Sequence, residues 1–301
     1  MVIAMKKLLV IILIISLFLI TGCTHKAVNF DIVATTLPVY EFTVLLCENT
    51  DLTIGRLITE NVSCLHDYTL QVSQMRMIEE SEIIVISGAG LEEFLNDALS
   101  SSKNIIDASE NTHIHFGDDY DAHDTHDAHG ELDHHHENDP HIWLSTENAK
   151  HMAQSVCRGL SNAYPQYQET FSKNLFSVLA KLDDLQAYGE HTLADISCRS
   201  LITFHDGFAY FAEGFDLNIL KSIEEESGSE ASAAEIIQLV DLVNFYQLPA
   251  VFTEASGSNA CARIIAAETD AEICTLDMAM AGDSYFDAMY HNIDTLKEAL
   301  K

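Results

Sequence analysis

Basic residues are scarce in this sequence. Its 15 Lys and Arg stand against 47 Asp and Glu, which gives a formal net charge of −32 at pH 7. A chain of this charge is repelled by phosphate backbones and by anionic lipid headgroups, so nucleic acid is excluded as a partner. We interpret most of the acidity as a solvated surface, with the secondary effect that a negative field concentrates divalent cations.

Several motifs of thiol and zinc chemistry are absent. No two cysteines have the CxxC spacing, which argues against thiol redox chemistry and against a cysteine zinc site. The HExxH motif of zinc proteases is also missing. Besides Cys23 there are six cysteines, an even number that permits disulfides in an exported protein: Cys47, Cys64, Cys157, Cys198, Cys261 and Cys274. Cys261 and Cys274 are the preferred pair, because we expect them on a helix and on the strand that follows it.

After residue 20 the sequence contains no apolar run long enough to cross a membrane. The one long run, residues 8–20, follows Lys6 and Lys7 and precedes small residues, an order that is typical of a secretion signal. The residues ITGC that end at Cys23 resemble the bacterial lipobox. We therefore predict that residues 1–22 are a lipoprotein signal peptide and that Cys23 carries the lipid. An uncleaved membrane anchor with an incidental cysteine is the alternative.

Apolar strand-like runs alternate with helical segments along the rest of the chain, which favours parallel sheets covered on both faces. In the first half we expect strands at residues 31–36, 52–57, 83–87 and 104–107, and helices at 39–47, 69–80 and 91–99. In the second half we expect strands at 200–204, 217–222, 250–253 and 273–276, and helices at 206–213, 231–246, 260–268 and 283–300. The predicted fold class is therefore α/β, with two lobes that each have a parallel sheet flanked by helices.

A long helical stretch separates these two halves. Residues 146–162 have apolar side chains at helical spacing, and Pro165 then permits a new helix to start. From Tyr167 to about His191, apolar residues recur three and four positions apart. This spacing predicts one rigid backbone helix, roughly 37 Å long. The predicted divisions are an N-terminal lobe (23–163, including a His-rich loop at 113–139), the linking helix (164–192) and a C-terminal lobe (193–301).

The segment 113–139 breaks this alternation, because it lacks apolar periodicity and consists almost entirely of His, Asp, Glu and small residues. Such a composition is typical of metal binding, since imidazole suits zinc, copper and nickel. Eight histidines form this predicted accessory metal loop: His113, His115, His123, His126, His129, His134, His135 and His136. A flexible loop loses conformational entropy on binding, so we expect a weak and poorly selective site. The alternative is a polar insertion that is His-rich without a function.

A tight metal site needs ligands on rigid elements, and four residues meet this condition. His66 follows the second predicted strand, and His141 follows a proline that stiffens its turn. His205 and Asp277 each come directly after a predicted strand of the second lobe. Because ligands of parallel α/β sheets bind beyond the carboxyl ends of the strands, a cleft between the lobes would bring the four together. Taken singly, each has a plain alternative as a hydrogen-bonding loop residue or, for Asp277, a helix cap.

The ordered motifs of the chain resemble one known family. They are HDY at His66, SGAGLEEFL at 87–95, the His-rich loop, DPHIW at 139–143, FHDGFAYFAEGF at 204–215, and TLD followed by GDSYFDAMYHN. From about residue 31 to the C-terminus, this set resembles the zinc- and manganese-binding lipoproteins of bacterial ABC importers, the cluster A-I or ZnuA-like solute-binding proteins. The resemblance implies two α/β lobes joined by one rigid helix. It also implies that His66, His141 and His205 are imidazole ligands and that Asp277 is the acidic ligand.

The resemblance also bears on the choice of metal. Manganese-selective relatives commonly have Glu at the third ligand position, so His205 indicates zinc. The chain departs from the family beside the first ligand, where Cys64-Leu65 replaces the usual proline before the histidine and Tyr68-Thr69 replaces Tyr-Glu. Cys64 is close enough in sequence to approach the metal, or it is disulfide-bonded.

The function implied by the resemblance is transport. We expect an extracytoplasmic protein, lipid-anchored to the bacterial cell membrane, that delivers Zn²⁺ to an ABC permease and its ATPase. It is expected to be a monomer and not an enzyme. One alternative is a manganese-specific protein of the same family, with Mn²⁺ as the ligand. The others are a zinc-dependent hydrolase, whose base would be Asp206 or Glu254 only by proximity in sequence, and a surface adhesin.

Overall fold

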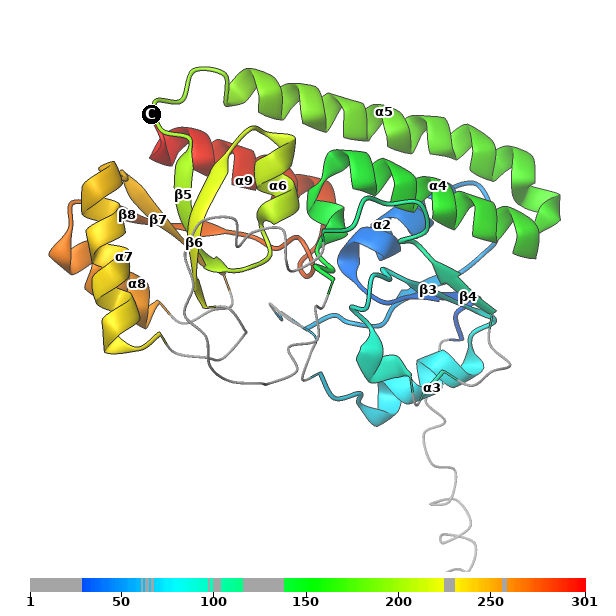
Figure 1. Ribbon diagram of the computed structural model, residues 1–301. Coiled ribbons are helices and arrows are strands. Elements are labelled where there is room, and N and C mark those ends of the chain that lie inside the picture. The colour runs from blue at the N-terminus through cyan, green and yellow to red at the C-terminus, as the bar shows by residue number, and fades with distance from the viewer. Residues whose placement is uncertain are drawn as a thin grey trace, which may run out of the picture.

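The computed structural model describes residues 29–60, 62, 65, 68–96, 98–99, 104–115, 138–224, 231–255 and 259–301. The predicted signal peptide, Cys23, Cys64, His66 and six of the loop histidines lie outside these residues. Two lobes lie side by side, and one long helix, α5, runs along both of them (Figure 1). Within the described residues, no helix has the length and apolar character that a membrane crossing requires.

The N-terminal lobe has a parallel sheet with the strand order β2-β1-β3-β4. Its strands are β1 (Ile32–Ala34), β2 (Ile54–Arg56), β3 (Ile83–Ile86) and β4 (Asn104–Asp107). Helices α2 (Leu37–Leu46) and α4 (Thr146–Ala163) cover one face of this sheet, and α3 (Val72–Glu80) lies on the other side (Figure 1). All three residues of β1 are buried, as expected for a central strand between two helical layers.

The prediction of a helix at residues 91–99 is wrong. Among the described residues of this stretch, the structure has a short 3-10 turn, η1 (Glu93–Leu95), and no α-helix. The buried carboxylate of Glu92 accepts hydrogen bonds from the backbone N–H groups of Ser87 and Gly88, at 2.7 and 3.0 Å. These bonds hold the chain in a tight loop after β3.

The C-terminal lobe repeats the topology of the first, with the strand order β6-β5-β7-β8. Its strands are β5 (Ser200–His205), β6 (Asn218–Glu224), β7 (Ala250–Glu254) and β8 (Glu272–Leu276). Its helices are α6 (Ala209–Gly214), α7 (Ala233–Tyr246), α8 (Ala260–Glu268) and α9 (Tyr285–Ala299). Successive side chains of β5 point to opposite faces. Leu201 packs in a core shared with the other lobe, whereas Ile202 packs in a second cluster with residues of α7 and α8.

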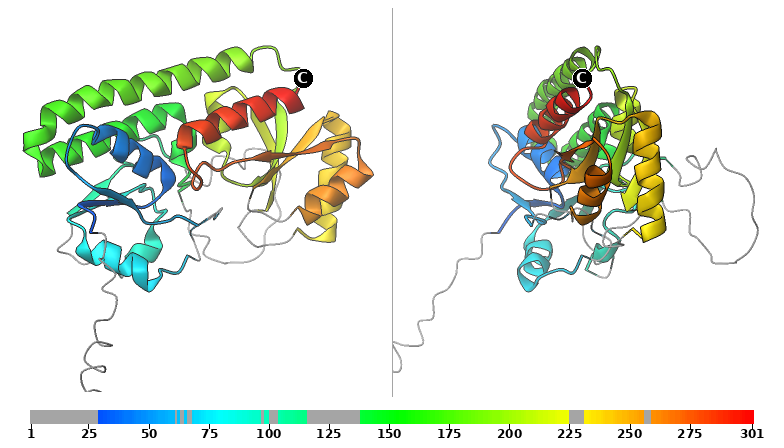
Figure 2. Two further views of the ribbon diagram at one scale, coloured as in Figure 1. Left: turned by 180° about the vertical axis from the view of Figure 1, so that it is seen from behind. Right: turned by 90° about the vertical axis from the view of Figure 1, so that its left-hand side faces the viewer.

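The linking helix α5 (Gln168–Thr192) is 25 residues long and follows a 3-10 turn, η4, that begins at Pro165. It lies against α4 of the first lobe and α9 of the second (Figure 2). Near its end Gly189 lies against the ring of Phe215, where there is no room for a side chain. The predicted α/β fold with two lobes and one long helix is therefore confirmed.

The two lobes are packed firmly against each other. The rings of Phe42 on α2 and Tyr285 on α9 meet edge to face, with centroids 5.2 Å apart. The carboxylate of Glu41 accepts a hydrogen bond from Tyr285 N, and Arg56 donates to the carbonyl of Gly282. One hydrophobic cluster accordingly continues through both lobes. This packing fixes the relative position of the strand ends that face each other across the lobes.

The predicted disulfide between Cys261 and Cys274 is not formed in the structure. Cys261 on α8 packs against the cluster formed with α7 and α8, whereas Cys274 on β8 packs against the core on the other face of the sheet. Two side chains on opposite faces of a sheet cannot reach the short Cβ separation that a disulfide requires. The prediction rested on nearness in sequence, which does not report the face to which a strand residue points.

Candidate metal centre

His141 occupies the turn between the lobes and is held by an aspartate two residues before it. Asp139 Oδ1 accepts from His141 N at 2.9 Å and lies 2.8 Å from His141 Nδ1. Because a carboxylate can only accept, Nδ1 carries the proton in this pair, and Nε2 is left as the ligand nitrogen. This is the support that metal-ligating histidines typically receive from a carboxylate. His141 then caps the 3-10 turn η3 (Ile142–Leu144).

His205 is the last residue of β5 rather than the residue after it, and its ring meets that of His141. The ring centroids are 5.1 Å apart and the planes are nearly perpendicular, at 83°. Both histidines are buried. Gly207 completes this contact, since a Cβ atom at that position would lie 3.1 Å from His205 Cδ2 and 3.2 Å from His141 Cε1. The structure therefore brings together two of the four predicted ligands from separate parts of the chain.

A hydrogen-bonded chain ties the segment of His141 to the loop after β8. Trp143 Nε1 donates to the carbonyl of Met278 at 2.7 Å, and Tyr285 Oη donates to the carbonyl of Trp143 at 2.8 Å. Burial raises the pKa of Tyr285 well above its usual range, so the phenol keeps the proton that it donates. These bonds place the turn of His141 beside residues 277–278.

Asp277 directly follows β8 and lines a cleft with Glu254 and Met278. Its backbone is fixed on both sides by Asn292, which accepts from Asp277 N and donates to Asp277 O. The Asp277 carboxylate accepts from Ala279 N at 2.7 Å. Within the described residues, it does not form a closed group of ligand atoms with the two histidine rings. Asp277 therefore stays a predicted ligand.

His66 lies outside the described residues, so its place in the site also stays a prediction. Val62, four residues before it, lines the same cleft as Asp277. Glu254, the last residue of β7, is buried and lines this cleft too. From the sequence, Glu254 was a candidate only as the base of a hydrolase, by its proximity along the chain. Its position as the terminal residue of the strand AVFTE is the signal that would have placed it at the carboxyl edge of the sheet.

The accessory loop is described only at its start, where His113 and His115 lie close to Glu213 on α6. Asp139 and Glu213 are the two residues of these sites that the sequence analysis missed. The DPH tripeptide was a usable signal for Asp139, because a carboxylate two residues before a histidine can reach its backbone and ring. For Glu213 the sequence offers no signal.

The donor set of the cleft is of a kind that zinc prefers. Imidazole nitrogen and carboxylate oxygen are both common ligands of tetrahedral zinc. The His141 and His205 rings meet each other near Met278, and Met278 lines the cleft together with Asp277 and Glu254. The residues present therefore fit a zinc ion as bound cargo.

Comparison with known proteins identifies the family of the chain. The family model described as "Zinc-uptake complex component A periplasmic" (ZnuA) matches residues 32–299. The zinc-binding lipoprotein AdcA of Streptococcus pneumoniae (strain ATCC BAA-255 / R6) is 31% identical over 301 residues, which cover 94% of this chain and 58% of AdcA. The chain thus spans less than two thirds of that relative.

Two solved structures have the same fold. A crystal structure of ZnuA has a TM-score of 0.77 and 25% sequence identity, and the match covers 91% of this chain and 100% of that one. A ZnuA deletion mutant with zinc bound has a TM-score of 0.76 and 25% identity, over 91% of this chain and 99% of that one. The family match spans nearly all of the described residues and both lobes. On this evidence the chain belongs to the ZnuA family of zinc-uptake components.

Proposed function

We propose that the protein binds one zinc ion in the cleft between its lobes and delivers it to an ABC importer. The observation that carries the proposal is the meeting of His141 and His205, from the inter-lobe turn and from the end of β5, with ring centroids 5.1 Å apart. The hydrogen bond that His141 Nδ1 donates to Asp139 leaves the other ring nitrogen for metal binding. Both imidazoles are buried, and His141 has the carboxylate support that is typical of a metal ligand.

The proposed ligand set is His66, His141, His205 and Asp277. Three neutral imidazoles and one carboxylate fill the tetrahedral shell of zinc. A filled shell leaves no position for an activated water, which suits a carrier and not a hydrolase. Family members are metal-binding components of uptake systems, and we extend this to the chain as a protein without catalytic activity. His205 in place of a carboxylate favours zinc over manganese, because imidazole is the softer ligand.

The proposed partners follow from the family. A zinc-uptake component is the extracytoplasmic part of a transport system, so we infer a permease and an ATPase that receive the ion. The proposed attachment to the membrane is the lipid at Cys23, as in the relative described as a lipoprotein. We further propose that the protein acts as a monomer. The packed interface between the lobes supports only modest hinge motion on release of the ion.

The histidines of the loop at 123–136 lie outside the described residues, and their role as accessory metal ligands is a proposal. Their composition supports a role in collecting zinc near the cleft. Because the histidines are many and ordering a loop of this composition costs conformational entropy, we expect them to bind several zinc ions weakly and none tightly.

The test is a zinc titration, in competition with a chromophoric chelator, of the full-length protein and of His205→Ala. The matched control is His291→Ala, which removes an exposed histidine of α9. Loss of a supporting residue behind a metal ligand typically costs 10–100-fold in affinity, so loss of the ligand itself should cost at least about 100-fold for the tightest equivalent. The control should bind as the unaltered protein does. Equal tight binding by His205→Ala would refute the cleft as the site.

A second measurement addresses the metal and the rival activity. Elemental analysis of the protein as isolated should find zinc, and zinc should displace manganese in competition. The zinc-loaded protein should leave ester and phosphoester substrates unhydrolysed. Turnover that is lost on Glu254→Gln would instead support the hydrolase, with Glu254 as its base.

A further inference from the structure

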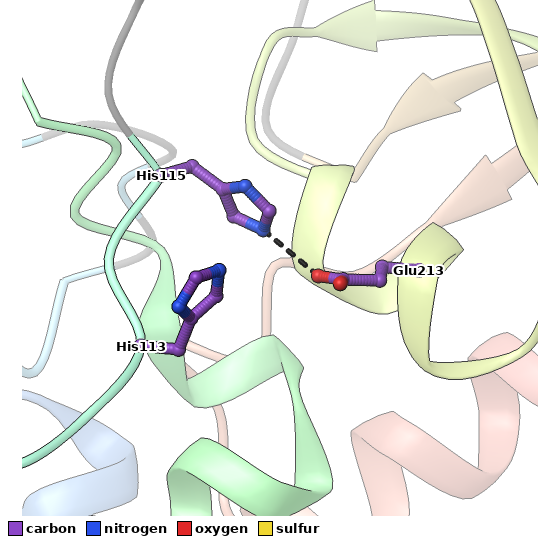
Figure 3. A group of neighbouring side chains, drawn as sticks. All are labelled: His113, His115 and Glu213. Carbon is purple, nitrogen blue, oxygen red and sulfur yellow. Dashed lines mark hydrogen bonds and ion pairs between the residues drawn. The ribbon is translucent and has the colours of Figure 1, made fainter. Parts of the chain in front are cut away.

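A second group of metal-ligand side chains lies outside the cleft. It consists of His113 and His115, from the segment after β4, and Glu213 on α6 (Figure 3). One ligand atom of each residue lies within 4.8 Å of the others. His115 Nε2 is 2.9 Å from Glu213 Oε2, and the two imidazole rings are 5.1 Å apart between centroids. Within the described residues, no other group of three meets this distance condition.

The backbone of the two histidines is anchored, so the group is not a chance meeting of mobile side chains. Asn148 on α4 accepts from His113 N at 2.8 Å and donates to His113 O at 2.9 Å. Tyr210 on α6 accepts from His115 N at 2.8 Å, and its ring packs against that of His115, with centroids 4.3 Å apart. Each histidine is therefore held by a helix through its main chain. One nitrogen of each imidazole lies on the side that faces Glu213 (Figure 3).

The simplest alternative is a surface ion pair between His115 and Glu213. The Glu213 side chain is 60% exposed, and pairs of this kind contribute little to stability. An ion pair, however, explains neither the convergence of His113 on the same point nor the paired hydrogen bonds that Asn148 makes to its main chain. Two imidazoles and one carboxylate are a donor set that suits zinc and similar divalent metals of borderline softness.

We propose that His113, His115 and Glu213 form a second zinc site, which joins the two lobes at the molecular surface. His113 and His115 belong to the first lobe and Glu213 to the second, so a bound ion bridges them in addition to the apolar interface. Three protein ligands leave the fourth position to water or to an incoming ligand. The exposure of Glu213 makes this site quicker to exchange its ion than the buried cleft. The inference does not depend on the function proposed for the cleft.

Two variants test this site with little damage to the fold. Glu213→Gln keeps the size of an exposed side chain and removes its charge. His113→Ala leaves the bonds to Asn148 intact, because both of them use main-chain atoms of His113. Glu268→Gln, which changes an exposed carboxylate on α8, is the control for Glu213→Gln. The loop histidines at 123–136 are kept in every variant, so any difference reports the three residues and not the loop.

The measurement is a Zn²⁺ titration in the His205→Ala background, in which the cleft has lost a proposed ligand. We expect one zinc equivalent whose affinity falls about tenfold or more in both His113→Ala and Glu213→Gln, and does not change in Glu268→Gln. Zinc should also slow hydrogen–deuterium exchange in residues 112–115 and in α6, and Glu213→Gln should abolish this effect. Unchanged affinity in Glu213→Gln would overturn the site. If the cleft proposal is the one that fails, His205→Ala will not weaken the most tightly bound zinc ion. The effect of Glu213→Gln on the second zinc ion can still be measured in that case.

Discussion

The two lobes have the same sheet topology but use the carboxyl ends of their central strands in different ways. In the N-terminal lobe, β1 and β3 are followed by Thr35 and Ser87, and both of these residues hydrogen-bond to the buried carboxylate of Glu92. In the C-terminal lobe, the corresponding strand β5 ends in His205, whose ring meets that of His141, and β7 ends in Glu254, which lines the cleft. In the N-terminal lobe, the polar groups at the strand ends hydrogen-bond within the lobe. In the C-terminal lobe, the strand ends carry side chains of the kind that bind metal ions.

This difference assigns a separate task to each lobe. The polar groups that follow β1 and β3 form hydrogen bonds with one another. Thr36 and Ser87, for example, share a hydrogen bond of 2.7 Å. A satisfied network of this kind makes a rigid wall. The C-terminal lobe instead has His205 and Asp277 at its strand ends, and His141 comes from the turn between the lobes. Among the described residues, the repeated topology thus carries proposed ligands directly at the strand ends of one lobe only.

Among the changes that test this comparison, substitution of Glu92 is expected to have the largest effect. Burial raises the pKa of Glu92 from 4.5 to about 7. Between these values the unfolded chain releases the proton while the folded chain keeps it, so the free energy of unfolding falls as the pH rises through this window. The loss is on the order of 3 kcal/mol across the window. It should be absent in Glu92→Gln, which has no proton to release.

Chemical denaturation of the wild type and of Glu92→Gln between pH 5 and pH 8 measures this difference. Glu92→Gln shifts the absolute stability because it alters the bond to Gly88 N, so the readout is the slope with pH and not the midpoint at one pH. Glu93→Gln changes an exposed neighbour and should follow the slope of the wild type. Parallel slopes for Glu92→Gln and the wild type would show that folding does not raise the pKa of Glu92.

A second, smaller effect sharpens the role of the inter-lobe turn. Asp139→Asn keeps an acceptor for His141 but removes the charge that makes the imidazole a better ligand. Changes of this kind behind a metal ligand typically lower affinity about 10–100-fold. Zinc titration measures the shift, and Asp184→Asn on the exposed side of α5 is the control. An affinity equal to that of the control would mean that His141 is not a ligand or that Asp139 does not support it.

Local patterns in the sequence predicted the strand ends of the C-terminal lobe well. Apolar runs that end in His205 and Asp277 identify the carboxyl edge of a parallel sheet from local information alone. The alternation of strand-like and helical segments supplied the two-lobed architecture, and the family resemblance agreed with it. The wrong predictions concern features that depend on tertiary structure. The expected helix at 91–99 gave way to the inward turn of Glu92, and the expected disulfide failed because Cys261 and Cys274 lie on opposite faces of a sheet.

Glu213 illustrates why part of the surface site could not be predicted. It lies 98 residues from His115 along the chain, in a helix whose other residues are mostly apolar and buried. Only the packing of α6 beside the segment after β4 brings the two together. No periodicity or motif encodes such a meeting, whereas the clustering of histidines at 113–136 was plain from composition.

The smallest expected effect is a steric one beside the His141 and His205 rings. A methyl group at position 207 would lie 2.6 Å from Met278 Cε and within 3.2 Å of the rings of His205 and His141. The thioether can move aside, but the imidazoles are held by β5 and by Asp139, so Gly207→Ala should displace a ring slightly and weaken zinc binding by up to about tenfold. Gly214→Ala is the matched control, because a Cβ there meets nothing within 4 Å. Zinc titration and thermal unfolding of both variants separate a local change in the site from a general loss of stability. Equal zinc affinity in the two variants would place the ion away from the point where the imidazoles converge, and the contrast between the lobes would then lose its functional meaning.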